Sequence, residues 1–272
     1  MRLVNARPSR GLALALGAVP ILAVAVAYVV ASAERLAANP DDKLLPSPAQ
    51  MWASFYGLAA IPDKRSGDLV LWIDTAASLE RIAAGVGLAT LAALVLGIAI
   101  GFVPRIRATL GPFVGIVSVI PPLAVLPILF IVLGLGEAAK IALIAIGVAP
   151  VMIRDTAERV REIPEELVVK AQTLGADTWT MILRLVLPMV MPRLVVCVRL
   201  ALGPAWLFLI AAEAIASTEG LGYRIFLVRR YLAMDVILPY VAWITLIAVA
   251  ADWLLALASR RLFAWAHPKV ER

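Results

Sequence analysis

Six apolar segments constrain the fold of this chain more than any other feature of its sequence. Five of them contain about 20 residues, the length that an α-helix needs to cross the hydrocarbon core of a bilayer, and the fourth is shorter. They lie at residues 12–31, 82–102, 113–133, 138–153, 194–215 and 236–258. With a mean hydropathy of +0.94 and only 16% charged residues, the chain differs strongly from a soluble domain. The sequence therefore predicts an all-α polytopic membrane protein with about six transmembrane helices.

Lysine and arginine indicate how these spans are oriented, because short cytoplasmic loops carry an excess of both residues. They are dispersed over loop ends without interleaved aromatic residues, so the net charge of +6 does not indicate nucleic-acid binding. We expect both termini and the loop 155–193 in the cytoplasm, and the segment 34–77 outside. This expectation depends on Arg2, Arg7, Arg10, Arg105, Arg107, Arg154, Arg159, Arg161, Arg260, Arg261, Lys269 and Arg272.

The N-terminal region can be interpreted in two ways. Basic residues precede the first apolar run and Ala31-Ser32-Ala33 imitates a cleavage site, but the run exceeds the ~7 to 15 residues of a signal-peptide core. We therefore expect residues 1–33 to be a cytoplasmic tail and an uncleaved first span. The aromatic side chains of Trp52 and Tyr56 predict a short interfacial helix in the outer segment, as an anchor or as a docking site for another protein. Residues 78–258 would form the transmembrane core and residues 259–272 a second cytoplasmic tail.

Glycines and prolines mark two of the core spans. Gly97 and Gly101 let another helix approach the second span closely, and packing within the chain is the simpler interpretation. Pro121, Pro122 and Pro127 remove backbone donors from the third span and should kink or interrupt it. Irregular backbone at membrane depth is tolerated only against protein or a water-filled cavity. These three prolines are therefore candidates for lining a translocation path, with simple kinking as the alternative.

Charges inside apolar spans are costly and are candidates for function. Arg199 lies six residues after Arg193, and Asp252 lies eight residues before Arg260, so both sit about 9 to 12 Å from the cytoplasmic ends of antiparallel spans. Equal depth predicts a structural ion pair between Arg199 and Asp252. Glu213 lies near the outer end of the fifth span, beside a glycine-rich loop with further charges.

The loop from Glu165 to Pro192 is a polar island between two spans, and its residues predict a helix, a turn and a second helix. Pro164 suits the first helical position, Gly175 can close the first helix in a left-handed cap, and Asp177 can cap the second helix. A loop lying flat on the membrane surface is the alternative.

The same loop resembles a cytoplasmic motif of bacterial ABC importer permeases. Lys170-Ala171-Gln172 precedes Gly175, and nine residues separate Gly175 from Leu185-Val186-Leu187-Pro188. Further segments resemble permeases of nitrate, sulfonate and taurine importers, over about residues 44 to 266. These segments are Leu45–Pro48, Ser78–Arg81, Ile120–Pro127, Gly134–Glu137 with Lys140, Arg199–Trp206 and Glu219–Tyr223. A fainter likeness to urea- or guanidine-related permeases involves the outer segments.

The resemblance implies a type I importer permease in the bacterial inner membrane, working as a homodimer with two ATPase copies and a periplasmic solute-binding protein. It places Trp206 and Glu213 near the translocation path or outer gate, where Arg199 and the three prolines are further candidates. The residues that it implies for coupling to the ATPase are Lys170, Ala171, Gln172, Thr173, Leu174, Gly175, Ala176, Asp177, Leu187 and Pro188.

Enzymatic chemistry has little support in the sequence. Cys197 and His267 are the only residues of their types, and no Gly-rich phosphate loop occurs, so we expect no metal, no cofactor and no ATP hydrolysis by this chain. The alternative function is an ion-coupled secondary transporter, in which Arg199, Glu213 and Asp252 would couple transport to an ion. A capped cytoplasmic helix pair has no role in that alternative.

Overall fold

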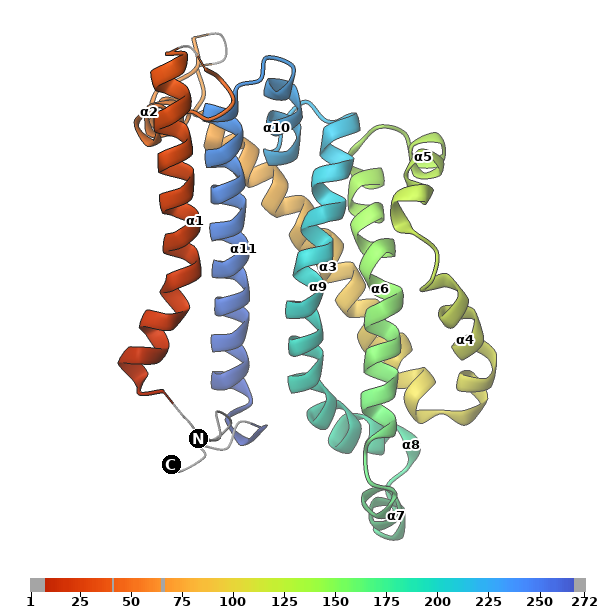
Figure 1. Ribbon diagram of the computed structural model, residues 1–272. Helices are drawn as coiled ribbons and strands as arrows, with labels where there is room; N and C mark the ends of the chain where they lie inside the picture. The colour runs from red at the N-terminus through yellow and green to blue at the C-terminus, as the bar shows by residue number, and fades with distance from the viewer. Residues whose placement is uncertain (1–7, 41, 65–66, 267–272) are drawn as a thin grey trace. The chain divides into compact units, whose positions relative to one another are not determined.

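The computed structural model describes residues 8–40, 42–64 and 67–266, and all regular secondary structure in these residues is helical (Figure 1). The chain separates into two compact units. The first contains residues 1–69 and 228–241, and the second contains residues 70–227 and 242–272. The terminal basic residues used for orientation, Arg2, Arg7, Lys269 and Arg272, lie outside the described residues, as does His267.

The first unit contains α1, Arg10–Ala38, and α2, Pro48–Ala60. Between them, the Tyr28 hydroxyl donates to the Pro46 carbonyl at 2.7 Å, and the Ser32 hydroxyl donates to the Leu45 carbonyl at 2.9 Å. Ser47 and Gln50 form a capping box at the start of α2. The predicted short helix is therefore present, and its position at a membrane interface stays a prediction.

The second unit holds the transmembrane core. Its helices are α3 (Val70–Phe102), α4 (Pro104–Val117), α5 (Pro122–Leu133), α6 (Glu137–Arg161), α7 (Glu165–Thr173), α8 (Thr178–Met181) and α9 (Leu187–Ala216). A π-helical turn, Ile182–Val186, joins α8 to α9. Two helices have residues in both units, α10 (Leu221–Arg229) and α11 (Met234–Leu262), and a short 3-10 helix, Ala264–Ala266, follows α11.

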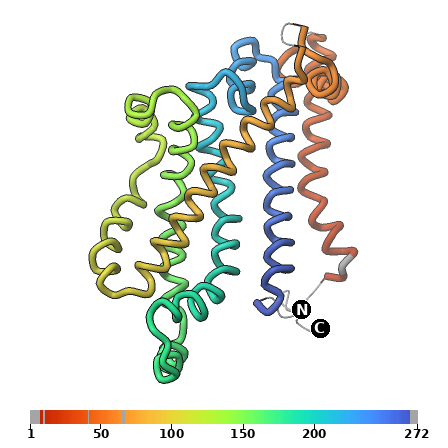
Figure 2. The backbone as a smooth tube through the Cα atoms, turned by 180° about the vertical axis from the view of Figure 1, so that it is seen from behind, coloured from red at the N-terminus to blue at the C-terminus, as the bar shows by residue number. Residues whose placement is uncertain are grey.

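Glycines let α3 pack closely against α6, which runs beside it through the centre of the second unit (Figures 1 and 2). A Cβ atom added at Gly97 would lie 2.6 Å from the Cβ of Thr156, and one at Gly101 would lie 2.5 Å from the Cβ of Val160. Neither distance is possible between real side chains. The Gly97-x-x-x-Gly101 pattern thus serves packing within the chain.

Prolines interrupt the predicted third span. Helix α4 ends at Val117, α5 begins at Pro122, and the two helices are bent by 96° relative to each other. Pro121 is the N-cap of α5 and Pro122 is its first residue, and at both positions the missing N–H group leaves no helical hydrogen bond unmade. Pro127 lies within α5 and does not end it. The span predicted at 113–133 is therefore a broken one.

Four helices of the described residues are long and apolar enough to cross a membrane, or five if the bent pair α4 and α5 counts as one span. They are α1, α3, the continuous stretch from α8 through α9, and α11. The expected fourth span lies in α6, which has 25 residues, but Lys140 and Arg154 interrupt its apolar run. The all-helical membrane architecture is confirmed, while α6 is less apolar than its neighbours.

Candidate functional site

The polar loop forms the predicted helix, turn and helix, with one difference from the expectation. Gly175 has a φ of +81° and donates its N–H to the Gln172 carbonyl at 2.9 Å, and the Ala176 N–H reaches the Ala171 carbonyl at 3.0 Å. This is a Schellman motif, which requires the left-handed conformation that glycine tolerates best. Pro164 stands one position earlier than expected, as the N-cap of α7.

Asp177 caps α8 as expected, because its Oδ1 accepts the Thr180 N–H at 3.1 Å. Hydrogen bonds from Thr180 lower the pKa of the Asp177 carboxyl, so the cap carries a negative charge at the positive end of the helix. The second helix does not end with α8. It continues through the π-helical turn into α9, where the Leu187 N–H bonds to the Ile182 carbonyl. Pro188 explains this turn, because its backbone nitrogen has no hydrogen to donate to the carbonyl four residues earlier. Its ring would also collide with that carbonyl.

Two apolar side chains on this loop are largely exposed. Leu174 is 79% exposed and Trp179 is 65% exposed, and no residue of α7 is buried. Figures 1 and 2 show α7 at the extreme end of the second unit, beyond the ends of α6 and α9. The other residues of the predicted coupling set are exposed or half-buried, namely Lys170, Ala171, Gln172, Thr173, Gly175, Ala176, Asp177, Leu187 and Pro188.

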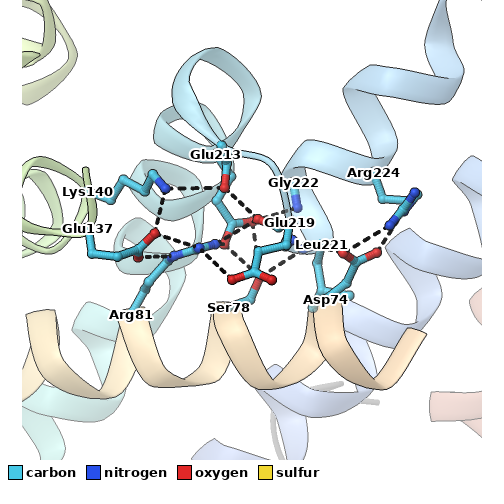
Figure 3. A network of polar contacts seen from close by, with 12 residues as sticks. Asp74, Ser78, Arg81, Glu137, Lys140, Glu213, Glu219, Leu221, Gly222 and Arg224 are labelled. Atoms are coloured by element: carbon cyan, nitrogen blue, oxygen red, sulfur yellow. Dashed lines mark hydrogen bonds and ion pairs between the residues drawn. The ribbon is translucent and has the colours of Figure 1, made fainter. Parts of the chain in front are cut away.

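A polar network occupies the other end of the second unit (Figure 3). One face of α3 supplies Asp74, Ser78 and Arg81, at spacings that place them one above the other on a helix. All three side chains are buried. We call this the α3–α10 network, and its other members are Glu137 and Lys140 of α6, Glu213 of α9, Glu219 and Arg224.

Arg81 joins three elements within the network. Its Nη1 donates to Glu213 Oε1 at 2.8 Å and to the Glu219 carbonyl at 2.9 Å, while its Nη2 donates to Glu137 Oε1 at 2.8 Å. Lys140 also donates to Glu137, at 2.7 Å. Every buried charge therefore has an oppositely charged partner, as burial requires.

The network also holds the start of α10 through three successive backbone N–H groups. Gly220 donates to Asp74 Oδ1 at 2.9 Å, Leu221 donates to Ser78 Oγ at 2.8 Å, and Gly222 donates to Glu213 Oε2 at 2.8 Å. The first N–H groups of a helix have no partner within it, and two carboxylates and a hydroxyl supply partners here. The loop between α9 and α10 is thereby tied to α3.

Glycine is required at the centre of this contact. Gly220 has a φ of +123°, and a Cβ atom there would lie 2.5 Å from the Cδ of Glu213 and 2.7 Å from Nη1 of Arg81. Both the positive φ and the lack of space around Gly220 exclude a side chain at this position.

The structure brings Arg199 and Asp252 together. Arg199 Nε and Nη2 donate to the two carboxylate oxygens of Asp252, each at 2.8 Å. The side chains are 32% and 43% exposed. Two parallel hydrogen bonds are the strongest geometry for this kind of pair, and its structural role stays a prediction.

The other candidates for a path or gate lie in different environments, and their role stays a prediction. Glu213 is fully buried within the α3–α10 network. Trp206 is buried too, and its Nε1 has no hydrogen-bond partner among the described residues. The three prolines of the broken span, Pro121, Pro122 and Pro127, are exposed or half-buried on the outside of the unit.

Sequence reasoning missed Asp74, Arg81 and Lys140 as members of a site. The expected second span began at residue 82, but α3 begins at Val70, so the end of the expected outer segment 34–77 is helical. Asp74 and Arg81 lie outside the expected span, and each is neutralised by a partner far away in the sequence. The signal that could have found the first two is the i, i+4, i+7 spacing of Asp74, Ser78 and Arg81 directly before an apolar run. No group of acidic, cysteine or histidine side chains in residues 8–40, 42–64 and 67–266 could hold a metal ion.

A helical membrane core with an exposed helix pair at one end fits a transport permease. Residues 85–272 match the family model described as binding-protein-dependent transport system inner membrane component. The chain belongs to this family, and it is thus the transmembrane permease subunit of an ABC importer.

Two relatives and one solved structure place the chain within the class. It is 32% identical to the taurine transport system permease TauC of Escherichia coli over 97% of this chain and 93% of TauC. It is 29% identical to a Bacillus subtilis protein named for aliphatic sulfonates transport, SsuC, over 82% of this chain and 78% of SsuC. An inward-facing structure of the MetNI methionine ABC transporter matches with a TM-score of 0.59 at 19% identity, over 71% of this chain and 94% of that one, which shows the shared fold. These comparisons give the secondary-transporter alternative no support.

Proposed function

We propose that α7 and α8 dock a separate ABC ATPase and that two copies of this chain form the permease. The observation that carries the proposal is the exposure of Leu174 and Trp179 at the end of a polar, capped helix pair. Apolar side chains held out on a rigid support are typical of protein contact sites. The loop 155–193 would lie in the cytoplasm of a bacterial cell with both termini, and a periplasmic solute-binding protein would deliver the solute from the other side.

The connection between α8 and α9 gives this docking site a mechanical role. Residues Thr178–Ala216 form one apolar helical stretch of 39 residues, interrupted only by the π-helical turn. Asp177 precedes its first residue and Glu213 lies near its last. A displacement of the ATPase-bound end would therefore reach the α3–α10 network along one continuous helix. ATP-driven closure would in this way change which side of the membrane the permease opens to.

The solute that we propose is a small sulfonate. TauC is named for taurine and SsuC for aliphatic sulfonates, which share a sulfonate group. Uptake of radiolabelled taurine and methanesulfonate by cells that express the permease with its ATPase and binding protein tests this proposal. Nitrate, urea and guanidinium are tested in the same assay, and uptake of one of these but of neither sulfonate would contradict the proposal.

Removal of the exposed apolar side chains tests the docking site. We expect Leu174→Ala and Trp179→Ala to reduce the amount of ATPase that co-purifies with the permease. Trp52→Ala is the matched control, because Trp52 is equally exposed but lies in α2. Equal ATPase recovery from all three variants would remove the docking role from α7 and α8.

A further inference from the structure

A cavity of about 400 Å³ lies between the C-terminal end of α6, the first half of α9 and the 3-10 helix after α11. We call it the Trp265 cavity. It lies at the same end of the second unit as α7 and α8, but none of the coupling residues lines it. Its polar lining consists of Arg159, Glu162 and Arg193, and Trp265 supplies an aromatic wall.

The two arginines of this cavity differ in their partners. Arg159 donates to both oxygens of Glu162, at 2.9 and 3.1 Å, and to Asp155 at 3.4 Å. Its charge is therefore offset within the protein. The side chain of Arg193 is exposed and forms no ion pair or hydrogen bond among the residues that the structure describes. One guanidinium thus remains available for an anion.

The rest of the lining is apolar and matches a position at the membrane surface. Met189, Pro192 and Val196 lie on α9 beside Arg193, at the point where its long apolar run begins. Trp265 is 61% exposed, and partly exposed tryptophans are enriched at the level of lipid headgroups. A ligand with a charged group and an apolar continuation fits both halves of this lining.

We propose that the Trp265 cavity binds the phosphate headgroup of an anionic phospholipid. Its volume is within the range of small-molecule sites, Arg193 donates to the phosphate oxygens, and the acyl chains continue along the apolar surface of α9. Basic pockets between transmembrane helices bind such headgroups elsewhere. A bound lipid would link α6, α9 and the end of α11 beside the coupling helices.

The test measures lipid retained by the purified permease complex in phosphatidylcholine nanodiscs with and without phosphatidylglycerol, using native mass spectrometry. We expect Arg193→Gln to weaken phosphatidylglycerol binding about fivefold, the change that one arginine near an anionic surface provides. Arg193→Lys should retain most of the binding. Arg105→Gln is the matched control, because Arg105 is exposed on α4 outside the cavity, and it should have no effect.

Three outcomes would overturn the proposal. The first is equal phosphatidylglycerol retention by the Arg193→Gln and Arg105→Gln variants. The second is displacement of the lipid by inorganic phosphate alone, which would identify a site for a free anion. The third is loss of the ATPase from Arg193→Gln with lipid retention unchanged, which would make the cavity part of the ATPase contact.

Discussion

Two glycines at the two ends of the second unit, Gly175 and Gly220, are constrained in different ways. Gly175 has nothing within 4 Å of its missing Cβ, so only its positive φ limits what can replace it. Gly220 is limited both by its φ and by Glu213 and Arg81. The first glycine could be predicted because a helix cap has a local signature. The second could not, because the atoms that crowd it come from distant parts of the chain.

Replacing Gly175 tests the turn between α7 and α8. Gly175→Val places a β-branched residue at a φ of +81°, which costs roughly 1 kcal/mol or more in this loop. We expect less ATPase to co-purify, with normal insertion of the permease into the membrane. Gly175→Asn, which tolerates the left-handed conformation better, should retain more ATPase than the valine variant. Equal recovery with both variants would mean that the cap does not position the docking surface.

The ion pair of Arg199 and Asp252 allows a charge-swap experiment. We expect Asp252→Ala to lower the free energy of unfolding, because it leaves the Arg199 guanidinium within an apolar span without its carboxylate partner. The double variant Arg199→Asp, Asp252→Arg should recover part of the lost stability and transport. Thermal unfolding in detergent and solute uptake measure the two effects. A double variant no better than the sum of the single changes would exclude a structural pair and leave Arg199 as a cavity residue.

At the scale of elements, the interruptions in the helices have clear chemical causes. Prolines break the span between α4 and α5 and produce the π-helical turn before α9. The first interruption was predictable from Pro121 and Pro122, while the geometry of the bend was not. The α3–α10 network, in contrast, depends on the packing of four helices, α3, α6, α9 and α10. No local sequence pattern predicts such a contact.

Breaking the α3–α10 network should destabilise the second unit strongly. Arg81→Met leaves Glu213 buried without its main positive partner, and removal of one member of a buried pair costs roughly 3 to 5 kcal/mol. The double variant Arg81→Met, Glu213→Gln should be more stable than Arg81→Met alone, because no buried carboxylate at position 213 then lacks a partner. Thermal unfolding of the purified permease measures the difference. Equal stability of the single and double variants would show that Glu213 does not depend on Arg81.

At the scale of the whole molecule, the orientation in the membrane is a prediction from the distribution of lysine and arginine. Cysteines placed at Lys64 and Glu162 test it, because both positions are exposed and the native Cys197 is buried. An impermeant thiol reagent should label the cysteine at position 64 in intact cells, and the cysteine at 162 only after the cells are opened. The reverse pattern would invert the topology and move α7 and α8 away from a cytoplasmic ATPase.

The sequence by itself determined the class of this protein, because apolar length, basic loop ends and helix caps act over a few residues and are visible in the order of the chain. It also placed Arg199 and Asp252 at equal depth, since helix rise converts residue number into height. Only the tertiary structure decided that Asp74, Arg81, Lys140 and Glu213 form one buried network. A charge is tolerated in a buried site only where a partner meets it. For Asp74, Arg81 and Glu213 that partner comes from another helix, whose position depends on the packing of α3 against α6 and α9.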